Sequence, residues 1–483
     1  MKKILMYAVA LAAGFSAMAQ NENINIFRND SEKVTSFKAS EIQSIKHTDG
    51  SAATGFQNLE IVGTNGKTTN IELSIIDSVQ TRLTNLPVFY VNLQDYHNWT
   101  ELQGSKDDKH PATLRMEGNG MFDDLAEQTV EFRGRGNSTW NMPKKPYRFK
   151  MDKKASVCGL PKDKNFVLLA NYIDCTLMRN AIAYWVANFL EMPYSNHAVP
   201  VKVIFNGIDK GAYLLTEKIG IGGGSVDIDE NTGILFELDS NYDEDFKFKY
   251  SKNGITLPVM VKDPDLTDIE FPEGYTTADQ YFQAWKADFT EMADAVITSN
   301  ADADLSQYIN LDALASFFVV QALACNNEVQ HPKSFYIHKK ALGKGEVYQF
   351  GPIWDFDWAY TYNGTTPENA SPTRLLASSN GDYQGGSFIQ ALFRNNAFRT
   401  IYKQKWDYFV AEGYPLLKKY MEDYAYNIEV QAINNGKLWP DDNSVSWKKT
   451  VSSLEFRSNY DKLKKWIEDR INFCNTHTNF GIY

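Results

Sequence analysis

The chain has 483 residues and is 43% hydrophobic and 13% aromatic, enough for a large packed core divided among about two to four domains. Its formal net charge of -11 argues against a general affinity for nucleic acid. Its four cysteines contain no CxxC pair and fit no zinc-site spacing, so free buried thiols are expected rather than a disulfide framework.

Residues 1–20 have the pattern of a secretory signal peptide. A basic start, Met1-Lys2-Lys3, precedes a short apolar run that ends in Ala-Met-Ala at residues 17–19. The run is too short to span a bilayer, and no later segment is long and apolar enough to do so. We therefore expect an exported protein, located in the periplasm, at the cell surface or outside the cell, with no membrane span.

Residues 21–85 are predicted to form a small β-rich module. Residues 35–45 and 69–79 resemble each other, because each has an extended apolar alternation followed by a short turn. Between them, the turn at residues 64–67 follows an apolar run and indicates a hairpin. The module holds no acid/base cluster, which favours a structural or docking role over catalysis.

The main domain is predicted over residues 87–475 and belongs to the α+β class. Its first part, to about residue 240, reads mainly as strands, at 87–93, 112–116, 128–136, 147–151, 166–172, 198–205, 211–217 and 233–238. A helix at 177–190, with Asp174 as its cap, interrupts them. Residues 241–275 read as an acidic loop. The part at 277–475 is mostly helical, with helices within 281–299, 311–324 and 388–473 and a hairpin at 335–338 and 347–350.

A pair of acids marks residues 351–358, whose sequence is GPIWDFDW. Asp355 and Asp357 are two residues apart, so on an extended segment both would point to the same side. Burying like charges among aromatic rings is costly unless a cation or a proton neutralises them. The hypothesis is a divalent metal on Asp355, shared with Asp357. The alternative is a strand end with two solvated acids.

Two polar stretches precede this pair. Residues 133–140 (RGRGNSTW) combine arginine, glycine and hydroxyl groups in a turn, and basic residues follow on the next strand, which suits phosphate oxygens. The alternative is an ordinary hairpin with charged flanks. Residues 325–334 crowd Asn, Glu, His and Lys at a helix exit, one hairpin before Asp355. This layout resembles a phosphoryl-transfer site, and its alternative is a solvated loop.

Four motifs in this order resemble the CotH family, the spore-coat protein H type of secreted kinase-like protein. The resemblance covers roughly residues 87–475. Its motifs are Arg135-Gly136-Asn137-Ser138-Thr139-Trp140 with residues 144–150, Asp174-x-Thr176-x-x-Arg179-Asn180, Asn206-Gly207-x-x-x-Gly211-x-Tyr213-x-Leu215-x-Glu217, and Pro352-x-Trp354-Asp355-x-Asp357.

The resemblance implies a highly diverged protein-kinase-like fold. It also implies binding of ATP with Mg²⁺ or Mn²⁺ and transfer of phosphate to a secreted or surface protein. Asp355 would then bind the metal, with help from Asp357 and the amide of Asn326. Glu328 would be the base, or Asn327 would position the acceptor hydroxyl. The implied nucleotide-binding residues are Asn137, Ser138, Lys145, Arg148 and Lys150, with Glu217 orienting the phosphate-binding cation.

This chain departs from the family pattern at the helix exit. The family often has an Asp there and an Asn before the next strand, whereas this chain has Asn326-Asn327-Glu328 and then Lys333-Ser334. A kinase and a pseudokinase are therefore both open. A non-catalytic surface protein that binds glycan or protein is the alternative from a different class, and a metal-dependent hydrolase using the same acids is the third.

Overall fold

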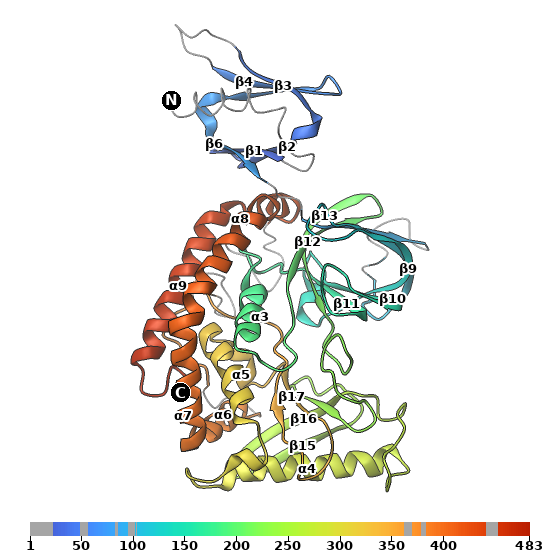
Figure 1. Ribbon diagram of the computed structural model, residues 1–483, viewed down its shortest axis with the longest axis vertical. Coiled ribbons are helices and arrows are strands. Elements are labelled where there is room, and N and C mark those ends of the chain that lie inside the picture. Colours follow the sequence, from blue (N-terminus) through green and yellow to red (C-terminus); the bar gives the residue numbers. More distant parts are fainter. Residues whose placement is uncertain are drawn as a thin grey trace.

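The computed structural model describes residues 23–48, 57–82, 86–94, 102, 104–361, 370–377, 383–440 and 453–483. The predicted signal segment at 1–20 lies outside these residues. Figure 1 shows a small β module beside a larger part that combines strands and helices. The fold is mixed α+β, with several sheets and a helical C-terminal part. Within the described ranges, no helix has both the length and the apolarity that crossing a membrane requires.

The N-terminal module consists of two three-stranded antiparallel sheets, in the orders β2-β1-β6 and β3-β4-β5. Its strands are β1 (Asn23–Arg28), β2 (Val34–Lys38), β3 (Ile42–Thr48), β4 (Asn58–Gly63), β5 (Thr68–Glu72) and β6 (Ile76–Arg82). The two stretches that resemble each other in sequence form the same unit, a strand, a 3₁₀ turn and a second strand. Their apolar side chains meet in one core of isoleucine and leucine.

The module rests on α8 (Tyr414–Leu438) of the larger part. Lys437 Nζ lies 3.0 Å from Glu32 Oε2 and donates a hydrogen bond of 3.1 Å to Val34 O. Lys33 Nζ pairs with Glu455 Oε1 at 3.0 Å. Val34 belongs to the core of the larger part rather than to the core of the module. The contact therefore combines ion pairs with one buried apolar side chain.

A closed barrel forms one side of the larger part (Figure 1). Its strands are β7 (Val88–Leu93), β8 (His110–Glu117), β9 (Leu125–Gly134), β10 (Tyr147–Ala155), β11 (Asp163–Leu169), β12 (Val199–Phe205) and β13 (Ile208–Glu217). Alternation on β10 sends Tyr147 and Phe149 into the barrel core, where Tyr147 stacks on Phe132. Arg148 and Lys150 lie on the outer face of the same strand.

A second sheet has the order β15-β16-β14-β17-β18. Its strands are β14 (Ile234–Leu238), β15 (Lys247–Lys252), β16 (Ile255–Asp263), β17 (Phe335–Lys339) and β18 (Gln349–Phe350). The predicted hairpin of β17 and β18 is confirmed, although β18 is short. The prediction of a loop over 241–275 is wrong, because β15 and β16 form a hairpin there. Asn253 and Gly254 have positive φ, as a two-residue hairpin turn requires. This Asn-Gly turn lies within a stretch rich in charged residues, which favoured the prediction of a loop.

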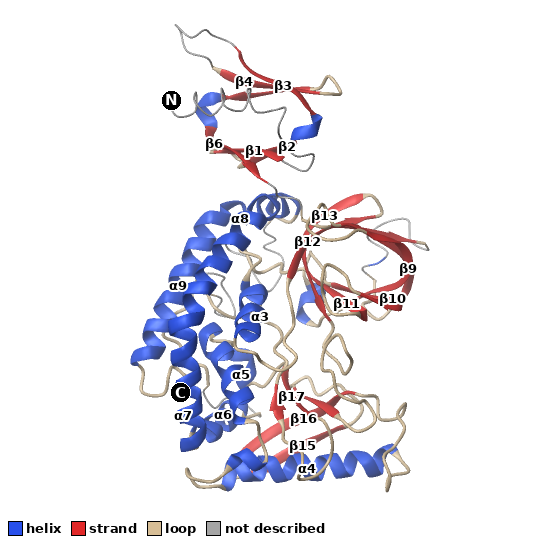
Figure 2. Ribbon diagram, viewed as in Figure 1, coloured by secondary structure: helices blue, strands red, loops and turns tan. Residues whose placement is uncertain are grey.

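Alternation also gives the second sheet two different faces. Phe236 on β14 packs on Phe289 of α4, and Phe335 on β17 stacks on Phe317 of α5. The register pairs Phe236 with Ile337 and Glu237 with Tyr336, so Glu237 and Tyr336 lie on the opposite face. In Figure 2, α4 runs along this sheet and α5 lies near β17. One face therefore closes the helical core while the other is left for a cleft.

The helices agree closely with the sequence periodicity. They are α3 (Arg179–Phe189), α4 (Ala278–Thr298), α5 (Leu311–Ala324), α6 (Gly385–Phe393), α7 (Asn396–Tyr408), α8 and α9 (Phe456–Thr476). The predicted bounds of α5 are confirmed. α3 starts two residues later than predicted, and Asp174 Oδ2 accepts a hydrogen bond of 2.8 Å from Arg179 N at its first turn. All four cysteines are free and buried, as expected.

His338 on β17 is a buried histidine whose neutral form the fold requires. Its side chain is 0% exposed, and Nδ1 lies 3.0 Å from Gly351 O, just before the GPIWDFDW stretch. Burial lowers its pKa to about 4. The unfolded chain binds a proton at His338 near pH 6.5, whereas the folded chain does not. The neutral His338 therefore contributes about 3 kcal/mol to the free energy of unfolding above pH 6.5, and this contribution is lost as the pH falls toward 4.

We expect His338→Leu to weaken the fold by about 1–2 kcal/mol at pH 7, because Gly351 O loses its donor. At pH 4.5 the gap to the native chain should shrink or reverse, since the variant has no proton to exclude. Urea denaturation at both pH values measures this difference. A gap that stays the same at both pH values would refute the role of His338.

Candidate functional site

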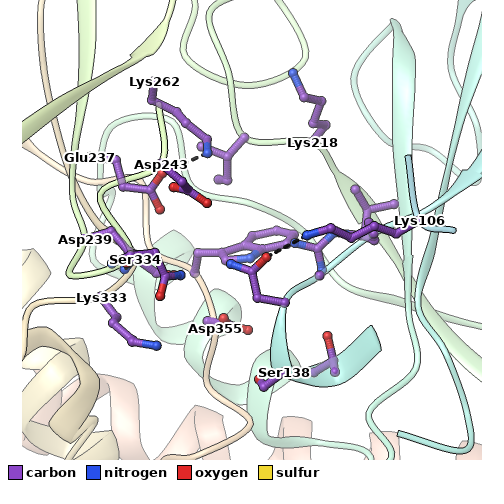
Figure 3. A pocket seen from close by; sticks show the side chains of 18 of the residues that line it. Lys106, Ser138, Lys218, Glu237, Asp239, Asp243, Lys262, Lys333, Ser334 and Asp355 are labelled. Atoms are coloured by element: carbon purple, nitrogen blue, oxygen red, sulfur yellow. Dashed lines mark hydrogen bonds and ion pairs between the residues drawn. The ribbon is translucent and has the colours of Figure 1, made fainter. Parts of the chain in front are cut away.

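A cleft of about 310 Å³ lies between the barrel rim and the free face of the second sheet. Figure 3 shows its side chains, with Lys106 and Lys218 on one side, Glu237 and Asp239 on the other, and Asp355 between them. Most of the basic side chains come from the barrel side and most of the acidic ones from the sheet side; the exceptions are Asp107 on the barrel side and Lys262 and Lys333 on the sheet side. The cleft is therefore polarised in charge from one wall to the other.

The basic wall is built by the end of β9 and the outer face of β10. Arg133, Arg135 and Arg148 all line the cleft. Burial, with Arg133 and Arg135 close by, lowers the pKa of Arg148 to about 10. Burial also lowers the pKa of Lys218, which follows β13. Cations that crowd together in a half-buried wall repel one another, and an anion between them would relieve that repulsion.

The turn after β9 completes the basic wall. Asn137 and Ser138 both line the cleft, and Lys106 Nζ donates a hydrogen bond of 2.8 Å to Asn137 Oδ1. Gly136 has φ +86°, and a Cβ there would lie 2.2 Å from Thr139 Oγ1. Glycine is therefore required for the turn to close, and its peptide groups lie at the cleft with those of its neighbours.

The acidic wall is built by β14 and β16. Burial raises the pKa of Glu237 and that of Asp239. Lys262 Nζ lies 2.8 Å from both Glu237 Oε2 and Glu244 Oε1, so this lysine is already paired. Asp239 accepts a hydrogen bond of 2.7 Å from Asn241 N. Glu237 and Asp239 are therefore held in position by partners within the acidic wall.

The floor of the cleft is Trp354 and Asp355. Asp355 has a left-handed backbone, with φ +65°. The expectation that Asp355 and Asp357 point to one side is therefore wrong, since it assumed an extended segment. Asp355 lines the cleft, whereas Asp357 is 7% exposed and its Oδ1 accepts a hydrogen bond of 2.8 Å from Asn180 Nδ2. Burial raises the pKa of Asp355, and the nearby Arg135 opposes this effect.

The first turn of α3 holds the floor in this shape. Asn180 Oδ1 accepts a hydrogen bond of 3.0 Å from Phe356 N. Arg179 Nη1 donates to Asp357 O at 2.8 Å, and its Nε lies 3.8 Å from Asp174 Oδ1. Arg179 and Asp174 are both 0% exposed. The sequence motif that contains these residues therefore has a positioning role, which the sequence reasoning did not assign.

The helix exit after α5 places one acid in the cleft. Glu328 lines it, and burial together with the charge of Asp355 raises the pKa of Glu328 well above its usual value. Asn326 Oδ1 accepts from Glu328 N at 3.3 Å, and its Nδ2 donates to Asp355 O at 3.4 Å. Asn326 thus braces the backbone between the two acids. Asn327 Nδ2 donates instead to Leu375 O at 3.0 Å and does not line the cleft.

Not all predicted nucleotide-binding residues reach the cleft. Arg148 lines it, but Lys150 is exposed outside it. Lys145 Nζ donates to Trp140 O and lies over the Trp140 ring. Glu217 pairs with His197, whose Nδ1 lies 2.6 Å from Glu217 Oε1, rather than with a phosphate-binding cation. The bond to Glu217 raises the pKa of His197.

Several cleft residues were missed by the sequence reasoning. They come from segments far apart in the chain, so no local pattern could group them. They are Lys106, Lys218, Glu237, Asp239 and Lys262. Arg133 and Arg135 also line the cleft, and they did carry a local signal, in the RGRG turn.

Comparison with known families defines the class of this fold and site. The sequence model of the family described as "CotH kinase protein" matches residues 132–474. This is most of the chain, so the protein belongs to the CotH family. The match includes the floor of the cleft and both walls except Lys106 and Asp107, but not the N-terminal module or strands β7 and β8. No curated protein sequence matches the chain.

Asn180→Ala should loosen the floor of the cleft. The change removes the donor to Asp357 Oδ1 and the acceptor of Phe356 N, so two buried groups lose their partner. We expect a loss of about 2–4 kcal/mol in the free energy of unfolding, measured by urea denaturation. Asn188→Ala, on the exposed side of the same helix, is the control: it removes hydrogen bonds of 2.8 Å to Tyr184 O and Asn196 O at an exposed position that water can reach, and should cost about 1 kcal/mol or less. Equal effects would contradict the positioning role.

Proposed function

We propose that the protein is a CotH-type kinase that binds ATP with a divalent cation in this cleft and transfers phosphate to a protein. The predicted signal segment makes an exported or surface protein the expected acceptor. The observation that carries the proposal is the polarised cleft, with three arginines on one wall and the half-buried carboxylate of Asp355 on the floor. Such a site suits a substrate that brings both phosphates and a metal.

The donor chemistry of the floor fits Mg²⁺ or Mn²⁺. These ions prefer oxygen ligands, and Mg²⁺ is commonly held by one or two carboxylates together with the phosphates of its substrate. Asp355 presents one carboxylate to the cleft. Among the described residues, no group of three or more His, Cys, Asp or Glu side chains is placed to hold a metal ion. When bound, the cation would neutralise charge on the phosphate oxygens.

The basic wall provides the groups for the triphosphate. Arg133, Arg135 and Arg148 would pair with phosphate oxygens, and the turn with Asn137 and Ser138 would donate further hydrogen bonds. The apolar side chains of Val167 and Ile219 line the same cleft and would contact the base.

In this proposal Glu328 acts as the general base, a role supported by its position in the cleft near Asp355. A carboxylate whose pKa is raised by burial holds a proton better than a solvated one. In the proposed step, the acceptor hydroxyl oxygen bonds to the γ-phosphorus as the bond from that phosphorus to the β–γ bridging oxygen breaks. Glu328 takes the hydroxyl proton, and ADP leaves with the electron pair.

Asp355→Ala tests the metal assignment. We expect the rise in thermal midpoint with ATP and Mn²⁺ to disappear and phosphate transfer to fall by at least 100-fold, because the cation loses its carboxylate. Asp152→Ala removes an exposed acid outside the cleft and should leave both unchanged. Full activity of the Asp355 variant would refute the assignment. Binding without transfer in the native chain would instead define a pseudokinase.

Arg148 and Lys150 form a matched pair for the phosphate wall, since they share one strand but only Arg148 lines the cleft. Arg148→Met should weaken ATP binding by about 10–100-fold, the effect of one charge-assisted contact. Lys150→Met should change it less than about twofold. Titration calorimetry with ATP and Mn²⁺ measures both. If the Lys150 variant were the weaker binder, the phosphate site would lie outside the cleft.

A further inference from the structure

Lys333 lines the cleft but has no role in the phosphate binding proposed for the basic wall. It lies on the acidic side, after the helix exit, and its backbone N donates to Glu328 O at 2.9 Å. In Figure 3 its side chain extends toward Asp355. The charge of Lys333 opposes the effect of burial on Glu328, Asp239 and Asp355, so it lies within electrostatic reach of all three acids.

On the acidic side of the cleft, Lys333 differs from Lys262 in having no fixed partner. Lys262 pairs with two glutamates, Lys106 bonds to Asn137, and Arg135 lies over the Trp354 ring at 5.1 Å. Among the described residues, the ammonium of Lys333 forms no direct ion pair or side-chain hydrogen bond. Its position is fixed at the backbone while its charge is free to meet a ligand.

Of the three residues expected to bind the metal, only Asp355 faces the cleft. In the acidic wall, Glu237 is paired with Lys262 and Asp239 accepts a hydrogen bond from Asn241 N. Asp355 faces the cleft, but Asp357 is bound by Asn180, and Asn326 is used by the backbone of Asp355 and Glu328. One carboxylate suits one divalent cation rather than two. A triphosphate with a single metal keeps excess negative charge at its terminal phosphate, next to the acids of this wall.

Resting on the proposed function, we infer that Lys333 binds the terminal phosphate of ATP beside a single divalent cation held by Asp355. The ammonium supplies the second positive charge that a second metal ion supplies in two-metal sites. During transfer Lys333 contacts a non-bridging oxygen of the γ-phosphate. It takes no proton, because Glu328 receives the proton of the acceptor hydroxyl and ADP carries away the electron pair.

The test compares nucleotides that have and lack the terminal phosphate. With Mn²⁺ present, Lys333→Met should weaken binding of a non-hydrolysable ATP analogue by about 10–100-fold while changing ADP binding less than about twofold. Lys340→Met, an exposed lysine at the end of the same hairpin strand, is the matched control and should change neither. Electron paramagnetic resonance should count one Mn²⁺ per bound analogue in the native chain.

The outcomes separate the inference from the function beneath it. If the native chain binds both nucleotides but the Lys333 variant loses affinity for both equally, or for neither, the inference alone fails. Two Mn²⁺ per bound analogue would also overturn it. If the native chain binds no nucleotide, the proposed function fails and the inference with it. Calorimetry and Mn²⁺ counting need no turnover, so they also decide the question for a pseudokinase.

Discussion

The buried pair of Arg179 and Asp174 is the constraint on which the site depends. Both side chains are 0% exposed, and a buried ion pair stabilises a fold only where further hydrogen bonds satisfy it. Here Asp174 accepts from the backbone of α3, and Arg179 reaches Asp357 O and Thr361 Oγ1. The pair thereby joins the start of a helix in the first half of the chain to the floor of the cleft in the second half.

The first turn of α3, which contains Arg179 and Asn180, also explains why Asp355 adopts a left-handed backbone. A non-glycine residue with φ +65° is unfavourable unless its neighbours hold it there. Asn180 binds both sides of the turn, through Phe356 N and Asp357 Oδ1. Asp357 is thus turned away to complete the buried network, and Asp355 alone is presented to the cleft. The two acids therefore have different surroundings, since Asp357 is bonded to Asn180 and Asp355 lines the cleft.

The polarised walls follow from strand alternation in two different sheets. β10 sends aromatic rings into the barrel and Arg148 outward, and β14 sends Phe236 to the helices and Glu237 to the cleft. Each sheet is ordinary by itself, with one apolar and one charged face. The site arises because the basic face of one sheet meets the acidic face of the other above Trp354. A substrate that brings phosphates and a metal ion would complement both faces.

Much of the fold could be read from local patterns. The strand pattern of the barrel and the repeat in the N-terminal module follow from periodicity, since burial repeats every two residues in strands. The bounds of α5 follow instead from a continuous apolar run, since every residue of this helix except Asp312 is buried. The hairpin of β15 and β16 was not predicted because the charged residues of its outer face favoured a loop, although an Asn-Gly turn lies among them. Among the site residues, Asp355, Glu328, Asn137 and Arg148 could be found because each lies in a local cluster of polar groups.

The sequence by itself determined which segments become strands and helices, which motifs mark the CotH family, and where charged side chains are concentrated along the chain. Only the tertiary structure decided which of those charges meet. Lys145 and Lys150 look equivalent to Arg148 in sequence, yet the path of the barrel rim brings only Arg148 to the cleft. Glu237 and Lys333 come from separate segments and share the cleft because Lys333 shortly precedes β17, which pairs with β14 in one sheet. Contact depends on packing between elements distant in the chain, and local spacing carries no information about that packing.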